Sequence, residues 1–345
     1  MKPFKDPQGI AAALQVWYHR NARDLPFRQT RDPYKIFLSE LMLQQTQVTT
    51  MLPYYDRFLK RYPTIQSVAS AQQSEVLKYW EGLGYYSRAR YIHETARMIV
   101  DMHGGTFPSD LKTIESLKGI GRYTARAIHS IAFNQPSVAV DGNVMRVISR
   151  LTLFDDDIKK TRSMRQVETA VQPLMNASEP RVFTQALMEL GALVCTKTPE
   201  CEVCPLASYC FAYEQNKQDV FPVVAKPREK NHEHYAVHVI HRGPRYYLTQ
   251  RASTGLLANM WEFPMHTGAP DSQRYLKDIG ASPASVDYMG RVNHTFTHKT
   301  WTMDVYVIAL NMDSAQLVDL TAFSGAISKA HRKIIDLLKA NNLPI

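Results

Sequence analysis

Residues 117–125 read LKGIGRYTA, and the glycines Gly119 and Gly121 separate two stretches with helical periodicity, 111–117 and 123–133. Glycines one residue apart let the chain turn tightly and bring backbone N–H groups, at the positive end of the second helix, close to a phosphate. The pattern predicts a helix-hairpin-helix. An ordinary glycine-rich turn between packed helices is the alternative that these residues alone leave open.

The bulk composition predicts a globular protein with more than one core. The chain has 345 residues, 45% of them hydrophobic, which exceeds what a single hydrophobic core usually serves. Its 41 Lys and Arg against 32 Asp and Glu give a net charge of +9, which favours a polyanionic partner. Neither a membrane-spanning run nor a signal-peptide-like start is present, so we expect no membrane association.

The sequence changes character along its length. Residues 9–211 have helical periodicity broken at proline and glycine, and Ser74 is predicted to cap a helix that runs to Trp80. Residues 221–231 have two prolines and no periodicity, as linkers do. Alternating residues then predict strands, with a hairpin near 242–244, and 328–340 is helical. We therefore predict a mainly α region at 1–220, a linker at 221–231 and an α+β domain at 232–345.

All the cysteines fall within sixteen residues, which indicates a metal site. A disulfide framework suits small secreted domains, and this chain is long and shows no export signal. The spacing is C-x5-C-x2-C-x5-C, whereas a zinc ribbon usually offers two C-x-x-C pairs, so a 4Fe-4S cluster is favoured over zinc. The predicted ligands are Cys195, Cys201, Cys204 and Cys210.

Two carboxylates are candidates for chemistry. Glu40 lies in a largely apolar helical stretch and shares a face with Ile36 and Leu43, so burial would raise its pKa and let it donate a proton at neutral pH. A paired or rim carboxylate is the alternative. Asp141 follows an apolar run and precedes a helix, so it is expected to be an N-cap, and its second oxygen could still face a substrate.

Several of these motifs occur together in one known family. Residues 117–125, residues 140–147 (VDGNVMRV) and the cysteine cluster follow one another as in helix-hairpin-helix DNA glycosylases. With residues 39–48 (SELMLQQTQV) and 80–88 (WEGLGYYSR), the chain resembles MutY-type adenine DNA glycosylases over nearly its whole length. The resemblance implies a six-helix bundle, with an iron-sulfur domain at 195–210, that excises adenine from DNA.

The resemblance also implies catalytic roles. Glu40 matches the glutamate that protonates adenine at N7, and Asp141 matches the aspartate that stabilises the oxocarbenium-like state, with Asn143 assisting. Tyr123 stands where the endonuclease III branch has a lysine that attacks the sugar. Since a phenol cannot form a Schiff base, the enzyme is expected to be monofunctional and to leave an abasic site.

The resemblance places further residues at the DNA. Amides can pair with an orphaned base and an aromatic ring can wedge between base pairs, roles that suit Gln44, Gln45, Tyr85 and Tyr86, although Tyr85 and Tyr86 could equally belong to the core. The resemblance places Gln45 and Tyr85 at the lesion. An adenine pocket would be lined by Phe27, Arg28 and Gln185. At position 27 the family pattern has tryptophan, and in the first cysteine interval it has six residues where this chain has five.

Residues 255–264 (GLLANMWEFP) and 294–298 (HTFTH) resemble the MutT-like domain that reads 8-oxoguanine opposite the target adenine. In that resemblance Phe296, Thr297 and His298 form the recognition loop, with threonine where the family has serine. The metal box of Nudix hydrolases, with its Arg-Glu-x-x-Glu-Glu core, is absent from the sequence, which argues against nucleotide hydrolysis.

We therefore expect double-stranded DNA with an adenine mispair as the partner, and a monomer in the bacterial cytoplasm at the nucleoid. Two other functions remain open. A glycosylase/lyase of the endonuclease III type is disfavoured by Tyr123 and the added C-terminal domain. A lesion-binding protein without turnover is disfavoured because both carboxylates are present.

Overall fold

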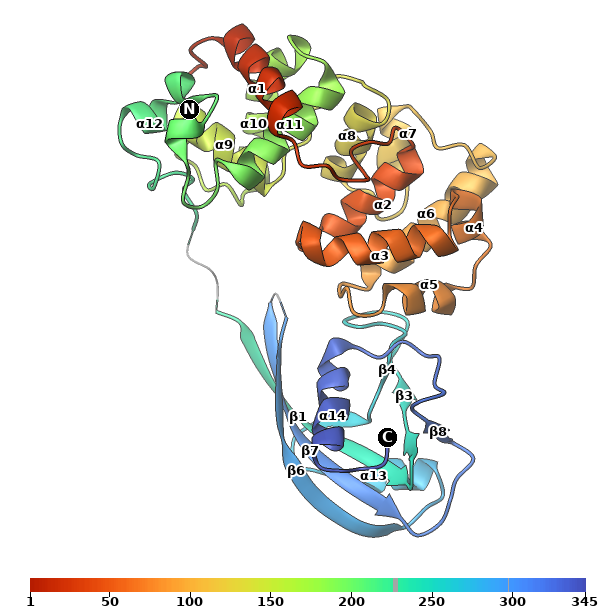
Figure 1. The fold of residues 1–345 in the computed structure, drawn as a ribbon. Helices are drawn as coiled ribbons and strands as arrows, with labels where there is room; N and C mark the ends of the chain where they lie inside the picture. The colour runs from red at the N-terminus through yellow and green to blue at the C-terminus, as the bar shows by residue number, and fades with distance from the viewer. Residues whose placement is uncertain (226–228, 297) are drawn as a thin grey trace. The chain divides into compact units, whose positions relative to one another are not determined.

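A computed structural model describes residues 1–225, 229–296 and 298–345 (Figure 1). The chain divides into two compact units. One comprises Met1–Ser70 and Tyr91–Pro227, and the other comprises Ala71–Arg90 and Arg228–Ile345. The later boundary falls inside the predicted linker, and the segment Ala71–Arg90 groups with the C-terminal region.

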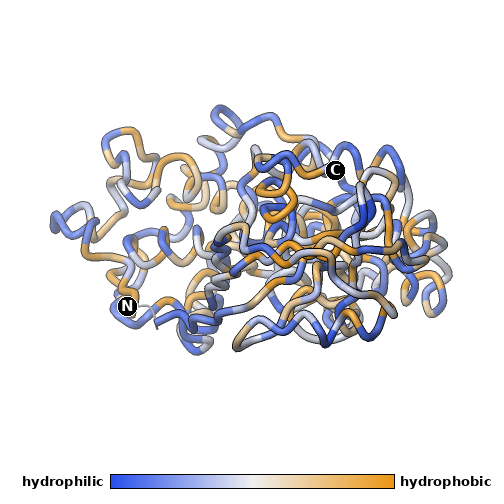
Figure 2. Tube along the Cα trace, turned by 90° about the horizontal axis from the view of Figure 1, so that it is seen from below, coloured by the Kyte–Doolittle hydropathy of each residue, from blue (hydrophilic) through white to orange (hydrophobic). Residues whose placement is uncertain are grey.

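The first unit is helical, as predicted (Figure 1). Hydrophobic and hydrophilic residues alternate along the helices, as amphipathic elements require (Figure 2). The helices up to residue 214 are α1 (Pro7–Asn21), α2 (Pro33–Leu43), α3 (Val48–Arg61), α4 (Ile65–Ala69), α5 (Gln73–Trp80), α6 (Ser87–His103), α7 (Leu111–Ser116), α8 (Arg122–Ile131), α9 (Gly142–Thr152), α10 (Thr161–Asn176), α11 (Pro180–Leu193) and α12 (Phe211–Glu214). Single 3₁₀ turns lie at Cys201–Val203 and Ala207–Tyr209. Of these helices, α5 and the start of α6 belong to the second unit.

Helix α11 lies at the centre of the first unit. It begins with Pro180, which suits a first helical turn, and it packs against α1, α8 and α9. Its apolar residues Phe183 and Leu190 are buried with Leu14 of α1 and Ile148 of α9 in one core. Because α11 is buried on several sides, polar residues along it are held in the interior.

The predicted helix-hairpin-helix is present as α7 and α8, and its two glycines differ. Gly119 has φ +74°, and a Cβ there would lie 2.3 Å from the side chain of Tyr91. Only glycine fits this position. Gly121 is the N-cap of α8 with an ordinary φ of −84°, and a Cβ there would meet nothing within 4 Å. The hairpin therefore requires Gly119, whereas Gly121 leaves open space at the N-terminus of α8.

The predicted cap of α5 is wrong. Ser74 lies inside the helix, and the N-cap is Gln72, whose side chain makes no capping hydrogen bond. The backbone carbonyl of Gln72 already accepts hydrogen bonds from the N–H groups of Glu75 and Val76. The helix therefore begins two residues earlier than the serine suggested.

The C-terminal region is α+β, as predicted. Its main sheet has the strand order β6-β7-β1-β2-β8, in which β1 and β7 are parallel and β5 also pairs with β1, and β3 and β4 form a small second sheet. The predicted hairpin joins β1 to β2, with Arg242 opposite Arg245. The elements are β1 (Asn231–Arg242), β2 (Arg245–Tyr247), β3 (Thr249–Gln250), β4 (Trp261–Glu262), β5 (Met265–Thr267), α13 (Gln273–Asp278), β6 (Pro283–Thr295), β7 (Lys299–Leu310), β8 (Leu317–Asp319) and α14 (Lys329–Ala340).

Two separate cores cover the two faces of this sheet. Successive residues of a strand point to opposite faces, so Val239 and Ile240 of β1 belong to different cores. Val239 packs with Ile334 of α14, and Ile240 packs with Leu276 of α13. Among the described residues, no helix is both long and apolar enough to cross a membrane.

We expect Leu14→Ala to destabilise the first unit and Val16→Ala on the same helix to have little effect. Leu14 is fully buried, whereas Val16 is 52% exposed. Removing a buried leucine side chain costs about 2–5 kcal/mol, and surface changes usually stay within about 0.5 kcal/mol. Urea unfolding followed by circular dichroism measures both variants, and equal losses would contradict this packing of α1.

Candidate active site

A pocket of about 1000 Å³ in the first unit brings together residues from distant parts of the sequence. The volume is large enough for a nucleobase with its sugar. The predicted site residues that line it are Phe27, Arg28, Glu40, Gln44, Gln45, Tyr123, Asp141, Asn143 and Gln185.

Glu40 lies on α2, whose N-cap Asp32 and first residue Pro33 fix where the helix begins. The residue is 7% exposed, and Tyr123 Oη donates a 2.8 Å hydrogen bond to Glu40 Oε2. Burial raises the pKa of Glu40 to about 7; the negative charge of Asp141 acts in the same direction, and the Tyr123 hydrogen bond opposes them. Glu40 can therefore carry a proton near neutral pH, as the sequence predicted.

Tyr123 is a fixed donor beside that carboxyl. It lies on the first turn of α8, next to the hairpin. Burial and the charges of Glu40 and Asp141 raise its pKa, so the phenol keeps its proton. The hydroxyl can therefore donate to a carboxylate, whereas it offers no nitrogen for an imine.

Asp141 is both a helix cap and a residue of the pocket. As the N-cap of α9 it accepts a 2.7 Å hydrogen bond on Oδ1 from the Val144 N–H, and Oδ2 accepts a 2.9 Å bond from Asn143 Nδ2. Burial raises the pKa of Asp141, and these hydrogen bonds oppose the rise. The two interpretations of Asp141 made from the sequence are therefore compatible.

Arg146 extends this network and was not singled out from the sequence. Its Nη2 donates to Asn143 Oδ1 at 2.8 Å and to the Gly191 carbonyl at 2.7 Å, and its Nε donates to the Cys195 carbonyl at 2.7 Å. The only sequence signal is local, because an arginine three residues after Asn143 shares a helix face with it.

Glu189 is a second buried carboxylate that the sequence analysis missed. Arg23 donates to Glu189 through Nε at 2.7 Å and Nη2 at 2.8 Å, and Arg28 Nη2 forms an ion pair with it. Burial alone would raise the pKa of Glu189, but these two arginines hold it at about 2. The available signal was the one used for Glu40, a glutamate within an apolar helix.

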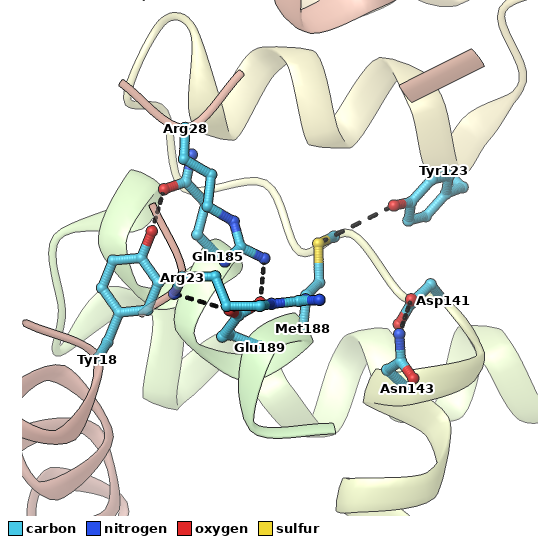
Figure 3. Close-up of polar contacts among 9 residues, drawn as sticks. All are labelled: Tyr18, Arg23, Arg28, Tyr123, Asp141, Asn143, Gln185, Met188 and Glu189. Atoms are coloured by element: carbon cyan, nitrogen blue, oxygen red, sulfur yellow. Dashed lines mark hydrogen bonds and ion pairs between the residues drawn. The ribbon is translucent and has the colours of Figure 1, made fainter. Parts of the chain in front are cut away.

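Figure 3 shows two groups of polar side chains on either side of Met188. Glu189 and its arginines form one group with Gln185, whose Oε1 accepts a 2.6 Å hydrogen bond from Tyr18. Tyr123, Asp141 and Asn143 form the other, and Tyr123 Oη is 4.0 Å from Met188 Sδ. Phe27 contacts Tyr55 edge-on at a ring distance of 6.1 Å. One pocket thus combines a proton donor, carboxylates, an amide and an aromatic ring.

Other predicted site residues lie elsewhere in the structure. Tyr85 belongs to the second unit, is 44% exposed and has a left-handed backbone with φ +48°. Phe296 packs on Trp301 at a ring distance of 4.7 Å, and the His298 carbonyl accepts a hydrogen bond from the Asn231 N–H. Thr297 lies outside the described residues.

The cysteines line one small hollow together with Arg150. Arg150 Nη1 lies 3.3 Å from Cys195 Sγ and 2.6 Å from the Thr196 carbonyl, so it braces the loop. Burial raises the pKa of Cys204 to about 12. Across the described ranges, no three His, Cys, Asp or Glu side chains converge as ligands of a single ion. Four thiols around one hollow are a donor set that either zinc or an iron-sulfur cluster accepts.

Comparisons with known proteins match two separate parts of the chain. Residues 38–173 match the HhH-GPD superfamily of base excision DNA repair proteins, and residues 235–337 match the NUDIX domain family. A solved thermostable thymine-DNA glycosylase is 29% identical and has a TM-score of 0.53, covering 61% of this chain and 97% of its own. An endonuclease III in a trapped DNA complex, 23% identical with a TM-score of 0.51 and covering 61% of this chain and 98% of its own, shows the same fold.

Curated relatives extend the match over most of the chain. The adenine DNA glycosylase of Mus musculus is 36% identical over 90% of this chain and 72% of its own length, and that of Homo sapiens is 36% identical over 89% and 68%. The adenine DNA glycosylase of Buchnera aphidicola (strain Bp) is 33% identical over 86% and 84%. The chain therefore belongs to the adenine DNA glycosylases of the helix-hairpin-helix base excision repair superfamily.

Proposed function

We propose that this protein is a monofunctional glycosylase that removes adenine mispaired with 8-oxoguanine or guanine in double-stranded DNA. The observation that carries the proposal is a pair of carboxyls in one pocket, the buried Glu40 and the partly buried Asp141. Glu40 has a pKa of about 7, and Asp141 is held by Val144 and Asn143. A proton donor and a stabilising carboxylate are the two groups that glycosidic bond hydrolysis requires.

In the proposed reaction, the adenine is flipped out of the duplex into the pocket. Glu40 gives its proton to N7, the bond between C1′ and N9 breaks, and its electron pair leaves with the base. The cationic sugar is stabilised by Asp141, positioned by Asn143, until water adds at C1′ and passes a proton to the Glu40 carboxylate. Tyr123 donates to Glu40 and provides no amine, so the DNA strand stays intact at an abasic site.

The proposed adenine pocket comprises Phe27, Arg28 and Gln185. Arg28 Nη1 is buried without a hydrogen-bond partner, while its Nη2 is held by Glu189. A buried unpaired donor is costly, and a nucleobase nitrogen would satisfy it. The Tyr18 hydrogen bond fixes the orientation of the Gln185 amide, which can then pair with the edge of the base.

We propose that the remaining contacts grip the duplex around the flipped base. The N-terminus of α8, with Gly119 and Gly121, suits a backbone phosphate because N–H groups point outward there. Gln44 and Gln45 would fill the space left by the base, and Tyr85 would wedge into the stack. The net charge of +9 favours such binding.

The domain at 232–345 is proposed to recognise 8-oxoguanine. The Phe296 carbonyl accepts a hydrogen bond from Lys230, and the Phe296 ring packs on Trp301. These contacts fix Phe296, the first residue of the predicted recognition loop of Phe296, Thr297 and His298. The catalytic region would then comprise residues 1–220, joined to the recognition domain by the linker 221–231.

We propose that Cys195, Cys201, Cys204 and Cys210 hold a 4Fe-4S cluster. The cluster would cross-link the cysteine loop and so help to position the DNA-binding surface, and we assign it no step in base removal. Arg146 links the cysteine loop to Asn143, and through it to Asp141, so correct folding of this loop supports the geometry of the pocket.

With end-labelled duplexes, we expect cleavage of the adenine strand only after alkali, fastest opposite 8-oxoguanine, slower opposite guanine and absent opposite cytosine. Glu40→Gln should slow adenine release about 100- to 10,000-fold while DNA binding persists, because a general acid contributes that much. Glu179→Gln is the matched control, since Glu179 is exposed and makes no capping bond.

Three results would contradict the proposal. Strand cleavage without alkali would indicate a lyase. Tight binding without base release in the wild type would favour a lesion-binding protein. Full activity in Glu40→Gln would exclude Glu40 as the acid.

The single-turnover rate should fall as pH rises through about 7, because only protonated Glu40 can donate and its pKa is about 7. In the wild type the hydrogen bond from Tyr123 lowers the pKa of Glu40. Tyr123→Phe removes this bond and should therefore move the midpoint to higher pH. Rates from pH 5 to 9 for both proteins provide the measurement. A midpoint that stays fixed or moves to lower pH in Tyr123→Phe would contradict the assignment.

Purified protein should absorb broadly at about 400 nm and contain about four iron atoms per chain. Cys204→Ser should lose both, whereas Ser208→Ala in the same loop should retain them. Metal analysis by mass spectrometry is the measurement, and stoichiometric zinc in the wild type would overturn the cluster proposal.

A further inference from the structure

The loop that presents Tyr85 has an unusual backbone. Gly82 has φ +97°, Gly84 +77° and Tyr85 +48°, so three of four consecutive residues are left-handed. Glycine adopts this conformation readily, but for a bulky residue such as tyrosine it is strained and persists only where the surroundings hold it. Something in the structure must therefore fix the backbone at Tyr85.

The side chain of Arg88 binds the carbonyls of this loop. Arg88 lies in the first turn of α6 and is 4% exposed. Its Nη2 donates to the Gly84 carbonyl at 3.0 Å and to the Leu83 carbonyl at 3.4 Å, and its Nε is 3.4 Å from the Tyr85 carbonyl. Burial lowers the pKa of Arg88 to about 10, so it stays charged at neutral pH and strengthens these bonds.

The same guanidinium lies over two aromatic rings. Its central carbon is 5.2 Å from the ring centroid of Trp80 and 5.3 Å from that of Tyr85. Trp80 is fully buried, and its Nε1 donates to the Gly84 carbonyl at 2.9 Å. Arg88 therefore connects a buried ring to an exposed one through cation–π contacts while it holds the backbone between them.

We propose that Arg88 is the positioning residue that holds Tyr85 rigid for insertion into the DNA base stack. The inference rests on the proposed function, since base extrusion is the step that a rigid aromatic wedge assists. An ordered ring loses little conformational freedom on entering the duplex, whereas a mobile ring would have to be ordered at that step. Arginine suits this role because its planar fork binds several acceptors while its face stacks, which lysine cannot reproduce.

The test separates base extrusion from bond cleavage. The duplex carries 2′-fluoro-2′-deoxyadenosine, whose fluorine resists loss of the base, opposite 8-oxoguanine and beside the fluorescent base 2-aminopurine. Stopped-flow fluorescence then reports unstacking, and a cleavable duplex gives the single-turnover rate. The variants are Arg88→Met, Arg88→Lys and Tyr85→Ala. Arg242→Met is the control, because Arg242 also donates to a backbone carbonyl, that of Leu310, and lies far from Tyr85 in the sequence.

We expect Arg88→Met to slow both the fluorescence rise and base release about 10- to 100-fold, with partial rescue by Arg88→Lys. In the Tyr85→Ala background the same change should cost less than about twofold, since residues that act together are not additive. Circular dichroism melting identifies any variant that fails to fold, and Arg88→Lys then carries the comparison.

Two outcomes would overturn the inference. One is an unchanged fluorescence rise in both folded Arg88 variants, and the other is an equal loss with and without Tyr85. If the wild type unstacks the base but releases no adenine, the proposed function fails while the role of Arg88 is still measured.

Discussion

A carboxyl group keeps its proton at neutral pH when it is buried and when nearby cationic side chains are paired with other carboxylates. Glu40 meets both conditions, since it is buried and accepts its hydrogen bond from an uncharged phenol. Arg28 lines the same pocket, and its charge lowers the pKa of Glu40, but less than burial raises it. The carboxylate of Glu189 binds Arg28 and Arg23 instead. Glu189 thus balances the arginines of the pocket while Glu40 remains an acid.

Helix α9 joins the pocket to the cysteine loop. Asp141 caps its start, and Arg146 and Arg150 follow on one face, four residues apart. Arg146 binds the Cys195 carbonyl, and Arg150 lies against the Cys195 sulfur. A shift of the loop would therefore act on the same rigid helix that orients Asp141. This arrangement explains why two arginines lie largely inside the protein, since each donates to several acceptors there.

Local patterns in the sequence predicted local structure well. Glu40 in an apolar helix, Asp141 before a helix and the paired glycines each depend on neighbours within a few residues, and the structure has the expected burial, cap and hairpin. The predicted cap at Ser74 was wrong because Gln72, two residues earlier, serves as the N-cap of the same helix. The ion pair of Arg23 with Glu189 joins residues 166 positions apart, so no local pattern reveals it.

Backbone strain gives an independent reason to look for function at Gln45 and Tyr85. Among the described residues other than glycine with positive φ, four are asparagines, which tolerate the left-handed region, and two are leucines. Gln45 and Tyr85 are the remaining ones. Glycine would relieve the strain at either position, and the chain has one directly before Tyr85. A strained conformation costs about 1–3 kcal/mol. What glycine would lack at these positions is the side chain, an amide lining the pocket at Gln45 and an exposed aromatic ring at Tyr85.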